Sequence, residues 1–544
     1  MELIKVLKNL NFSINVKNYL FFMVLGISIF SIIPLFTVII NSSVLNFDYS
    51  ILNNYVFLKF FTNSFIILFF VLILTFIFGV FSAYLVTFYT FFGSTFFKYS
   101  LILSFAIPPY IFGFSISAFF ENFGIGYSLI NFFSETNNGN NYLPNFSPIT
   151  NVIISLSFTL YGYVYLLLIT SFTNQSANLI DLGKSMGFST IKQFMKIIIP
   201  CAKPSIFIGL SLVAMETLAD FGTVSYFGVS TFTTGIYNSW FIFDDLRTSN
   251  LLSLILLSFV LVFFIIEHFS RKNSKFHFLK NDGKNKKTKL SGSKSFFAFF
   301  FCFSLFGISF IFPFSQMIYW SFKFPEYLKS LDILKLNFNT FILIFCTSTI
   351  LILFSIIVNF GNRVLKNSFL NFLSNLSISG YAIPGIIISV SIISFISYLS
   401  SLLNINLKSL FIGSFIGLVL GYFFRFYTIS FNAIKSNYLK INYSIDESSY
   451  LMGFSKMKTF SKVHWPIMRK DIFFIFVLIA LEIIKELPIT LILRPFNFET
   501  FSTKAYNFAS QDLIEAASIP SMFLIFWASF FILISLKYFF EDKK

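Results

Sequence analysis

Residues 181–200, DLGKSMGFSTIKQFMKIIIP, have a counterpart 266 residues later in residues 447–466, ESSYLMGFSKMKTFSKVHWP. In both copies an acid stands six residues before a glycine. A phenylalanine follows that glycine by seven residues and a proline by thirteen. The same offset continues into the next apolar run, where Asp220 corresponds to Glu486. A constant offset over such a stretch indicates a duplicated domain, and it decides how the rest of the chain is divided.

The composition indicates a membrane protein. Of the 544 residues, 56% are hydrophobic and only 11% are charged, and the mean hydropathy is +0.80. Average soluble domains have about a quarter charged residues, so this chain has too little polar surface to cover a water-soluble particle. Backbone groups in lipid must be hydrogen-bonded within their own segment. The sequence therefore predicts an all-α integral membrane protein.

Twelve apolar runs are long enough to cross a bilayer, which takes about 20 residues in a helix. Six precede and six follow the midpoint of the chain. We expect them near residues 20–41, 62–88, 98–120, 151–172, 205–222, 250–268, 296–320, 339–360, 376–399, 408–430, 471–488 and 520–540. Because each half has six crossings, the two copies run the same way through the membrane, as a parallel repeat.

A basic segment separates the halves. We expect a first six-helix domain at residues 1–268, a linker at 269–295 and a second six-helix domain at 296–544. The linker carries many lysines and a single acid, Asp282. The positive-inside rule places such a segment in the cytoplasm, together with both termini. The net charge of +16 is explained in the same way, so nucleic-acid binding is not needed to account for it.

The repeated segment is polar, and it lies between two membrane runs in each half. Residues before Gly187 or Gly453 would form one short helix and residues after it a second, because glycine lets the chain turn. Pro200 and Pro466 would stand at the entry of the following membrane helix, where a missing N–H costs little. A short exposed helix pair on a stiff bundle suits docking to a partner. An ordinary amphipathic loop is the alternative.

This segment resembles the EAA loop of ABC-importer permeases, in which Glu-Ala-Ala-x-x-x-Gly precedes a proline. Here Asp181-Leu182-Gly183 and Glu447-Ser448-Ser449 replace Glu-Ala-Ala. The resemblance covers two tandem permease domains. It implies the type I ABC importer permease fold and loops that dock on an ATPase subunit. The coupling residues it implies are Asp181, Gly183, Gly187, Pro200, Glu447, Ser449, Gly453 and Pro466.

A narrower resemblance concerns the substrate. The stretch Met215-Glu216-Thr217-Leu218-Ala219-Asp220-Phe221-Gly222-Thr223 and the stretch Lys485-Glu486-Leu487-Pro488 are similar to fused ferric-iron permeases. This resemblance implies iron(III) as the substrate, a periplasmic binding protein as a partner and the bacterial inner membrane as the location. Related fused permeases carry thiamine, phosphonates or polyamines, and these remain alternatives.

Several residues are candidates for the translocation pathway. Ionisable groups at membrane depth are costly and often mark a pathway, and acids at matching positions would suit a hard cation. Prolines at similar places in the two repeats would break helices that line it. The alternatives are fixed helix contacts, an ion pair with Lys485, and packing kinks. The candidates are Glu216, Asp220, Glu482, Glu486, Pro108 and Pro384.

The chain shows no catalytic or nucleotide-binding pattern. Gly183-Lys184-Ser185 lacks the first glycine of a P-loop, because Asn178 stands there. The three cysteines and three histidines form no metal-ligand spacing. We therefore expect no cofactor on this chain, with ATP and Mg on a partner ATPase that is a dimer. An ion-driven secondary transporter and a membrane-bound transferase are further alternatives, but neither accounts for the repeated polar loop.

Overall fold

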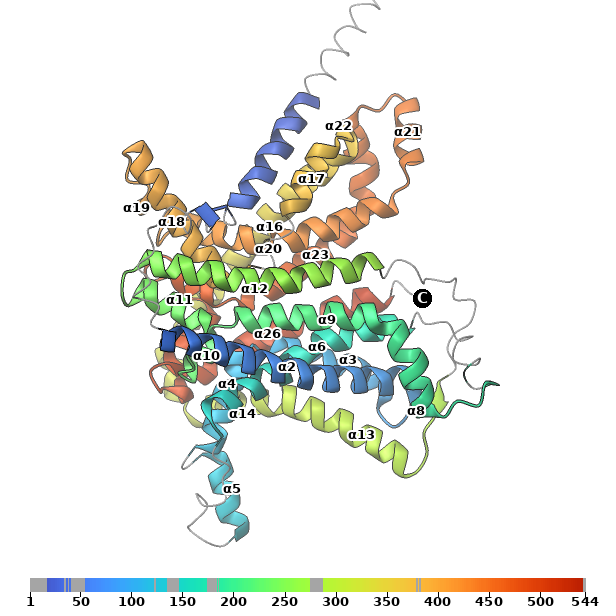
Figure 1. The fold of residues 1–544 in the computed structure, drawn as a ribbon, viewed down its shortest axis with the longest axis vertical. Coiled ribbons are helices and arrows are strands. Elements are labelled where there is room, and N and C mark those ends of the chain that lie inside the picture. Colours follow the sequence, from blue (N-terminus) through green and yellow to red (C-terminus); the bar gives the residue numbers. More distant parts are fainter. Residues whose placement is uncertain are drawn as a thin grey trace, which may run out of the picture. The chain divides into compact units, whose positions relative to one another are not determined.

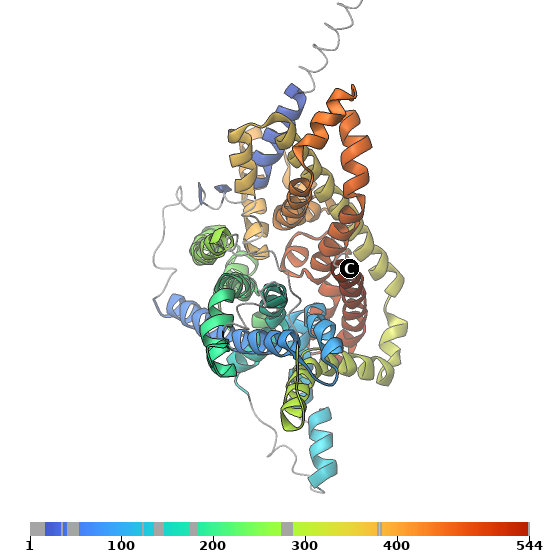
Figure 2. The ribbon, with the colours of Figure 1, turned by 90° about the vertical axis from the view of Figure 1, so that its right-hand side faces the viewer.

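The structure is a computed structural model. It describes residues 17–33, 36–37, 39–40, 54–121, 124–134, 146–173, 183, 185–273, 287–377, 380 and 383–541. These residues form helices almost throughout, as Figures 1 and 2 show. Within the described part, the exception is one parallel pairing of two-residue strands, β1 (Tyr89–Thr90) and β2 (Thr288–Lys289). The all-α prediction is confirmed.

Nine helical segments of the described residues are long and apolar enough to cross a membrane. Eight of them correspond to α2 (Asn54–Phe88), α6 (Pro148–Thr173), α9 (Ile199–Ala219) with the turns before it, α12 (Leu246–Asn273), α16 (Ile333–Leu365), α18 (Gly385–Leu403), α20 (Phe415–Lys440) and α26 (Ile514–Glu541). The ninth runs through α13 (Ser293–Phe306), η5 (Gly307–Ile311) and α14 (Phe312–Lys323).

The remaining predicted runs are helical too. A bent pair, α3 (Ser94–Ser100) with η1 (Leu101–Ala106) and then α4 (Pro109–Phe120), turns by 91° and counts as a tenth span if taken whole. A shorter apolar helix occupies Lys17–Ile33, and α23 occupies Trp465–Lys485. Every predicted run thus contains a helix.

The chain forms two compact units, and each takes segments from both halves of the sequence. Unit 1 comprises Met1–Asn46, Leu334–Thr500 and Leu533–Lys544, and unit 2 comprises Phe47–Ile333 and Phe501–Ile532. The first helix of the first half, Lys17–Ile33, thus belongs to unit 1, which holds most of the second half of the sequence. The first helix of the second half, α13, belongs to unit 2, which holds most of the first half. The predicted division at residues 269–295 separates the two repeats along the sequence. Each compact unit contains residues from both sides of this division.

Glycines let the central helices of unit 2 approach closely. A Cβ built on Gly79 of α2 would lie 2.7 Å from Cβ of Val164 in α6, and one on Gly209 of α9 would lie 3.0 Å from Cα of the same valine. Lipid is as apolar as a leucine side chain, so hydrophobicity does not drive spans together, and close backbone contact supplies the attraction instead. Val164 is completely buried between the two helices.

Tyrosines of α6 attach this core to the bent pair. The Tyr161 hydroxyl donates to the Leu101 carbonyl at 3.0 Å, and the Tyr165 hydroxyl donates to the carbonyls of Phe97 and Lys98 at 3.1 Å each. These three bonds attach α6 to α3 and to the start of η1.

The close contact at Gly79 gives a test of this packing. We expect Gly79→Ala to lower the free energy of unfolding by about 1–3 kcal/mol, because the added methyl must displace Val164. Thermal unfolding of the detergent-solubilised protein measures this. The matched control is Gly26→Ala in the first helix, where a Cβ meets nothing within 4 Å. That variant should be neutral or slightly more stable, and equal losses in both variants would contradict the packing described here.

Candidate functional site

The second repeated segment, in unit 1, forms two short helices joined by a glycine turn. The first is α21 (Tyr443–Leu451), and the second is α22 (Lys456–Thr459). Gly453 has φ +79°, a left-handed conformation that suits glycine. The N–H of Phe454 donates to the Ser449 carbonyl at 3.1 Å, which closes the end of α21. The turn brings α22 beside α21 (Figures 1 and 2).

The first repeated segment, in unit 2, has the same turn where it is described. Asp181 lies outside the described residues. Gly187 has φ +72°, and the N–H of Phe188 donates to the Gly183 carbonyl at 3.0 Å. The helix α8 (Thr190–Gln193) follows directly. The two turns therefore share their geometry as well as their sequence spacing.

The same sequence of elements follows both glycines. Ser189 and Ser455 cap α8 and α22 with their hydroxyls. A π-helical turn comes next, η3 (Phe194–Ile198) in one copy and η7 (Phe460–His464) in the other, and the long helix then begins. Pro200 and Pro466 stand in the first turn of α9 and α23, as predicted from the cost of a missing N–H.

The departures from Glu-Ala-Ala have a steric explanation. Gly183 and Ser449 occupy the place of the last alanine, and both are buried against the second helix of their pair. A Cβ on Gly183 would lie 2.6 Å from Cδ1 of Ile197. The Ser449 hydroxyl shares a 2.6 Å hydrogen bond with the Thr459 hydroxyl. The position requires a small side chain, and glycine and serine both meet that requirement.

Both segments present apolar side chains to the outside. In unit 1, Leu451 is 90% exposed and Met452 is 73% exposed; in unit 2, Met186 is 60% exposed. Glu447 is exposed as well. Exposed methionines and leucines beside polar groups are typical of a surface that binds another protein. An amphipathic loop that lies in the membrane interface would also expose such side chains, so the docking role stays a prediction.

A buried charge cluster attaches α21 to α16. Arg363 donates to the Asp446 carboxylate at 2.7 and 3.1 Å, and its remaining donors reach the carbonyls of Tyr438 and Ile441 at 2.9 Å each. His464 lies 2.9 Å from the same carboxylate. Arg363, Asp446 and His464 are all buried. An ion pair that is this fully hydrogen-bonded holds α21 in one orientation on the membrane helix.

Sequence reasoning singled out Glu447 and missed its neighbour Asp446. Burial would by itself raise the pKa of Asp446, but the hydrogen bonds from Arg363 and His464 outweigh it and hold the pKa of this carboxyl below its ordinary value. The only sequence signal was a second acid next to the motif. Its partner, Arg363, lies 83 residues earlier, and nothing in the pattern connects the two.

The pathway candidates Asp220 and Glu486 lie at equivalent places, directly after α9 and α23. The Asp220 carboxylate accepts hydrogen bonds from the Thr223 hydroxyl at 3.0 Å and the Val224 N–H at 3.1 Å. The Glu486 carboxylate accepts from Arg425 at 3.2 Å and from the Ile489 N–H at 3.3 Å. Each acid therefore accepts a hydrogen bond from an N–H in the first turn of the short helix that follows it, a role compatible with either interpretation of these residues.

The other two acidic candidates lie one turn earlier and are half-buried. Glu482 lies 3.5 Å from the Lys485 ammonium on its own helix, which is the ion pair considered as an alternative. Glu216 occupies the equivalent place in α9. The structure does not bring Glu482 and Glu486 onto one partner, because Glu486 pairs with Arg425 of α20.

Pro108 and Pro384 both stand directly before a helix, α4 and α18 respectively. Pro108 marks the 91° bend. After Pro384, a Cβ on Gly385 would lie 2.4 Å from Nη1 of Arg425 and 2.7 Å from Oε1 of Glu486. The break therefore brings the N-terminus of α18 against a buried ion pair. Pro108 thus lies at the break within a bent pair of helices, whereas Pro384 directly precedes the candidate span Gly385–Leu403. Their place in a pathway stays a prediction.

The described residues hold no group of three or more His, Cys, Asp or Glu side chains arranged to bind a metal ion.

The sequence is similar to those of known transport permeases. Residues 75–275 match the family described as "Binding-protein-dependent transport system inner membrane component". The chain is 22% identical over 475 residues to the Fe(3+)-transport system permease protein FbpB 2 of Haemophilus influenzae, covering 85% of this chain and 86% of that protein. It is 26% identical over 148 residues to a Chlorella vulgaris protein named "Probable sulfate transport system permease protein cysT", covering 27% and 53%.

The Arg363–Asp446 pair gives a test of how α21 is held. We expect Asp446→Asn to lower the free energy of unfolding by about 3 kcal/mol, because a buried guanidinium loses its counter-charge. Glu447→Gln, one residue along and exposed, should change it by less than about 0.5 kcal/mol. Thermal unfolding measures both changes.

The pH dependence provides a second readout of the same pair. A carboxyl whose pKa is depressed in the folded state stabilises the protein above its unfolded pKa and loses that contribution as pH falls through the folded value. The difference between the parent and Asp446→Asn should therefore be full at neutral pH and shrink below about pH 4. A difference that stayed constant down to acid pH would contradict the ion pair.

Proposed function

We propose that this chain, which belongs to the family of inner membrane components of binding-protein-dependent transport systems, is the fused permease subunit of an ABC importer for iron(III). It is a multi-pass membrane protein with no catalytic role of its own in transport. A separate ATPase dimer binds ATP and Mg and supplies the energy. A periplasmic binding protein delivers the substrate.

The observation that carries this proposal is the pair of equivalent glycine turns at Gly187 and Gly453. Each lies in a turn before a short helix that leads into a long apolar helix, and exposed apolar side chains stand beside it on a polar segment. Two such surfaces, one in each unit, suit a dimeric ATPase whose subunits each accept one loop. When ATP draws the ATPase subunits together, the two loops follow, and the long helices α9 and α23 carry the displacement into the membrane.

The orientation follows from the charge of the connecting segments. A cytoplasmic N-terminus and six crossings per half would place the linker, the C-terminus and both glycine turns in the cytoplasm. The outer ends of α9 and α23, with Asp220 and Glu486, would then face the binding protein. ATP changes the balance between inward-open and outward-open states through its different affinity for the two arrangements of the ATPase.

Iron(III) as the substrate is supported by the relative from Haemophilus influenzae, which matches along nearly the whole chain. The carboxylates beyond α9 and α23 are hard oxygen ligands of the kind such a cation favours. Thiamine, phosphonates and polyamines remain alternative substrates. Uptake measured with each substrate on its own binding protein distinguishes them.

The glycine turns provide the test of coupling. We expect Gly187→Asp and Gly453→Asp to reduce ATP-driven uptake by about tenfold or more, since coupling energies of 1–3 kcal/mol correspond to roughly 5–150-fold. A Cβ at either glycine meets nothing within 4 Å, so the helices should remain folded. Uptake and ATPase activity in proteoliposomes containing the neighbouring subunits measure this.

Gly413 supplies the matched control. It has φ +69° and open space around a built Cβ, like the two coupling glycines, but it lies between α19 (Lys408–Phe411) and α20. Gly413→Asp imposes the same backbone strain away from the docking surface, so its uptake should be close to that of the parent. An equal loss in all three variants would assign the effect to strain rather than to coupling.

Asp220 provides a test of the pathway. Asp220→Asn keeps an oxygen acceptor for Thr223 and removes the charge. If the acid contacts the substrate, uptake should fall by about tenfold or more, because a hydrogen bond or contact to a charged group is worth about 1.5–3 kcal/mol. Thr223→Val removes the hydroxyl donor but keeps the carboxylate. If Thr223→Val lowered uptake as much as Asp220→Asn, the acid would have only a structural role.

A further inference from the structure

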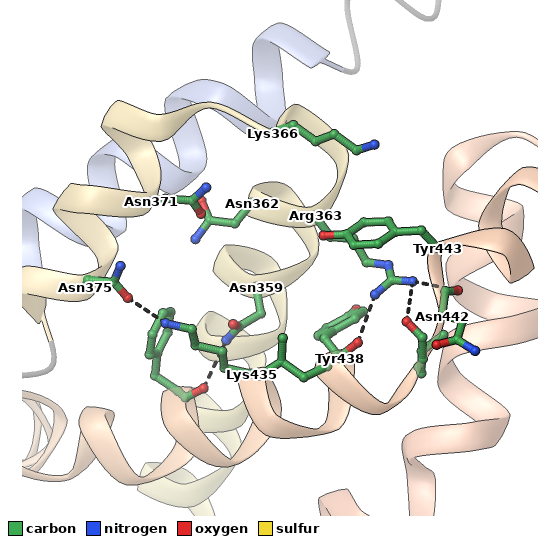
Figure 3. Close-up of a pocket in the computed structure, with 13 residues that line it drawn as sticks. Asn359, Asn362, Arg363, Lys366, Asn371, Asn375, Lys435, Tyr438, Asn442 and Tyr443 are labelled. Carbon is green, nitrogen blue, oxygen red and sulfur yellow. Dashed lines mark hydrogen bonds between the residues drawn. The ribbon is translucent and has the colours of Figure 1, made fainter. Parts of the chain in front are cut away.

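A polar pocket of about 360 Å³ lies in unit 1 beside the start of α21 (Figure 3). The end of α16, the short helix α17 (Ser368–Leu376) and the end of α20 enclose it. The described lining contains three basic side chains and no carboxylate. They are Arg363, Lys366 and Lys435, accompanied by Asn359, Asn362 and Asn371.

The three basic groups differ in what they already do. Arg363 is committed to Asp446 and to backbone carbonyls. Lys366 is exposed, and Lys435 donates to the Asn375 side chain at 2.7 Å. Figure 3 shows the two lysines on opposite sides of the asparagines, Lys366 at the end of α16 and Lys435 on α20. The Asn359 amide already donates to the carbonyls of Ser355 and Phe431, and the Asn362 amide donates to the Ser374 hydroxyl. An anionic ligand would therefore be attracted mainly by the positive charge of the basic side chains.

Backbone geometry also singles out Lys366. It has φ +50° just after α16, a conformation that glycine or asparagine adopts more readily than lysine does. Its ammonium lies 4.9 Å from the centre of the Tyr443 ring, whose centre is 4.5 Å from the Arg363 guanidinium. Lys366 therefore has a strained backbone, and its contact with the Tyr443 ring holds its side chain beside the pocket.

The surroundings place the pocket at a membrane surface. Both α16 and α20 are candidate spans, and they end beside it at Leu365 and Lys440. The helix α17 turns Leu370 and Ser374 inward, whereas Phe369, Phe372 and Leu376 are exposed at helical spacing along it. A short helix with an exposed apolar stripe is typical of an interfacial helix that rests on lipid.

We propose that this pocket binds a phosphate group, and that the group is the headgroup of an anionic phospholipid whose chains lie along the apolar stripe of α17. Lysine ammonium groups suit phosphate oxygens, and basic pockets between spans at a membrane surface are typical sites for anionic headgroups. A free phosphate would use the lysines and leave the stripe uncovered. The cytoplasmic leaflet as the source rests on the orientation given under the proposed function.

A bound lipid here would act on the coupling segment. Tyr443 belongs to α21 and touches both Arg363 and Lys366. Occupancy of the pocket would therefore stabilise α21 on α16, in addition to the Arg363–Asp446 pair. Unit 1 would then hold its docking helix in a lipid-dependent orientation.

The experiment measures lipid retention by the full chain purified from mixed phosphatidylglycerol and phosphatidylcholine bilayers, using native mass spectrometry. The parent should retain phosphatidylglycerol in preference to phosphatidylcholine. Lys366→Gln/Lys435→Gln should retain about tenfold less or lower still, since each lysine near the surface contributes about a factor of five. The matched control is Lys294→Gln/Lys470→Gln, which removes two exposed charges that do not line the pocket and should retain as much phosphatidylglycerol as the parent.

Three outcomes would overturn the proposal. Equal retention by the parent and the pocket variant would exclude a lipid site. Binding of inorganic phosphate to the parent without retention of phosphatidylglycerol would assign the pocket to free phosphate. Loss of ATPase copurification in the pocket variant, with lipid retention unchanged, would assign it to an acidic segment of that partner. Lipid retention needs neither ATP nor iron, so its failure is distinguishable from failure of the transport proposal.

Discussion

A left-handed backbone at one glycine in each half of the chain determines the geometry of the proposed coupling site. Gly187 and Gly453 both have positive φ, and the next helix starts three residues later, directly after a serine cap. Any other residue at these positions would strain the turn. Because the π-helical turn and the proline follow at the same spacing, each docking segment continues into a membrane helix through one continuous helical path.

The two copies share this turn but are attached differently to the rest of their units. In unit 1 a buried Arg363–Asp446 pair and His464 hold α21 on α16. In unit 2 the residue equivalent to His464 is Ile198, so the histidine of that cluster has no counterpart there. A duplicated chain can thus keep one docking geometry while each copy evolves its own internal contacts, and the lipid pocket proposed for unit 1 is consistent with that difference.

The positions of the membrane helices followed from hydropathy, because a helix is the one local solution for an isolated backbone in lipid. The turns followed from the spacing of glycine and proline. The Arg363–Asp446 pair did not, because it joins residues far apart in the sequence, and neither residue type signals the other. The sequence also could not predict that the first helix of each half packs in the unit formed mainly by the other half. Apolar periodicity shows which face of a helix is buried, but it does not show which helix covers that face. Gly183 and Ser449 departed from the family pattern, and only the packing explains why a small side chain suffices.

The most direct test uses single cysteines at Met186 and Met452, equivalent exposed positions beside the two glycines, in a chain whose three native cysteines are replaced. Both sites are labelled by a membrane-impermeant thiol reagent in inside-out vesicles and probed for crosslinking to the neighbouring ATPase. We expect labelling of both sites from the cytoplasmic face and a crosslink from each. Labelling from opposite faces, or a crosslink from neither, would contradict a role of the two glycine turns in coupling to the ATPase.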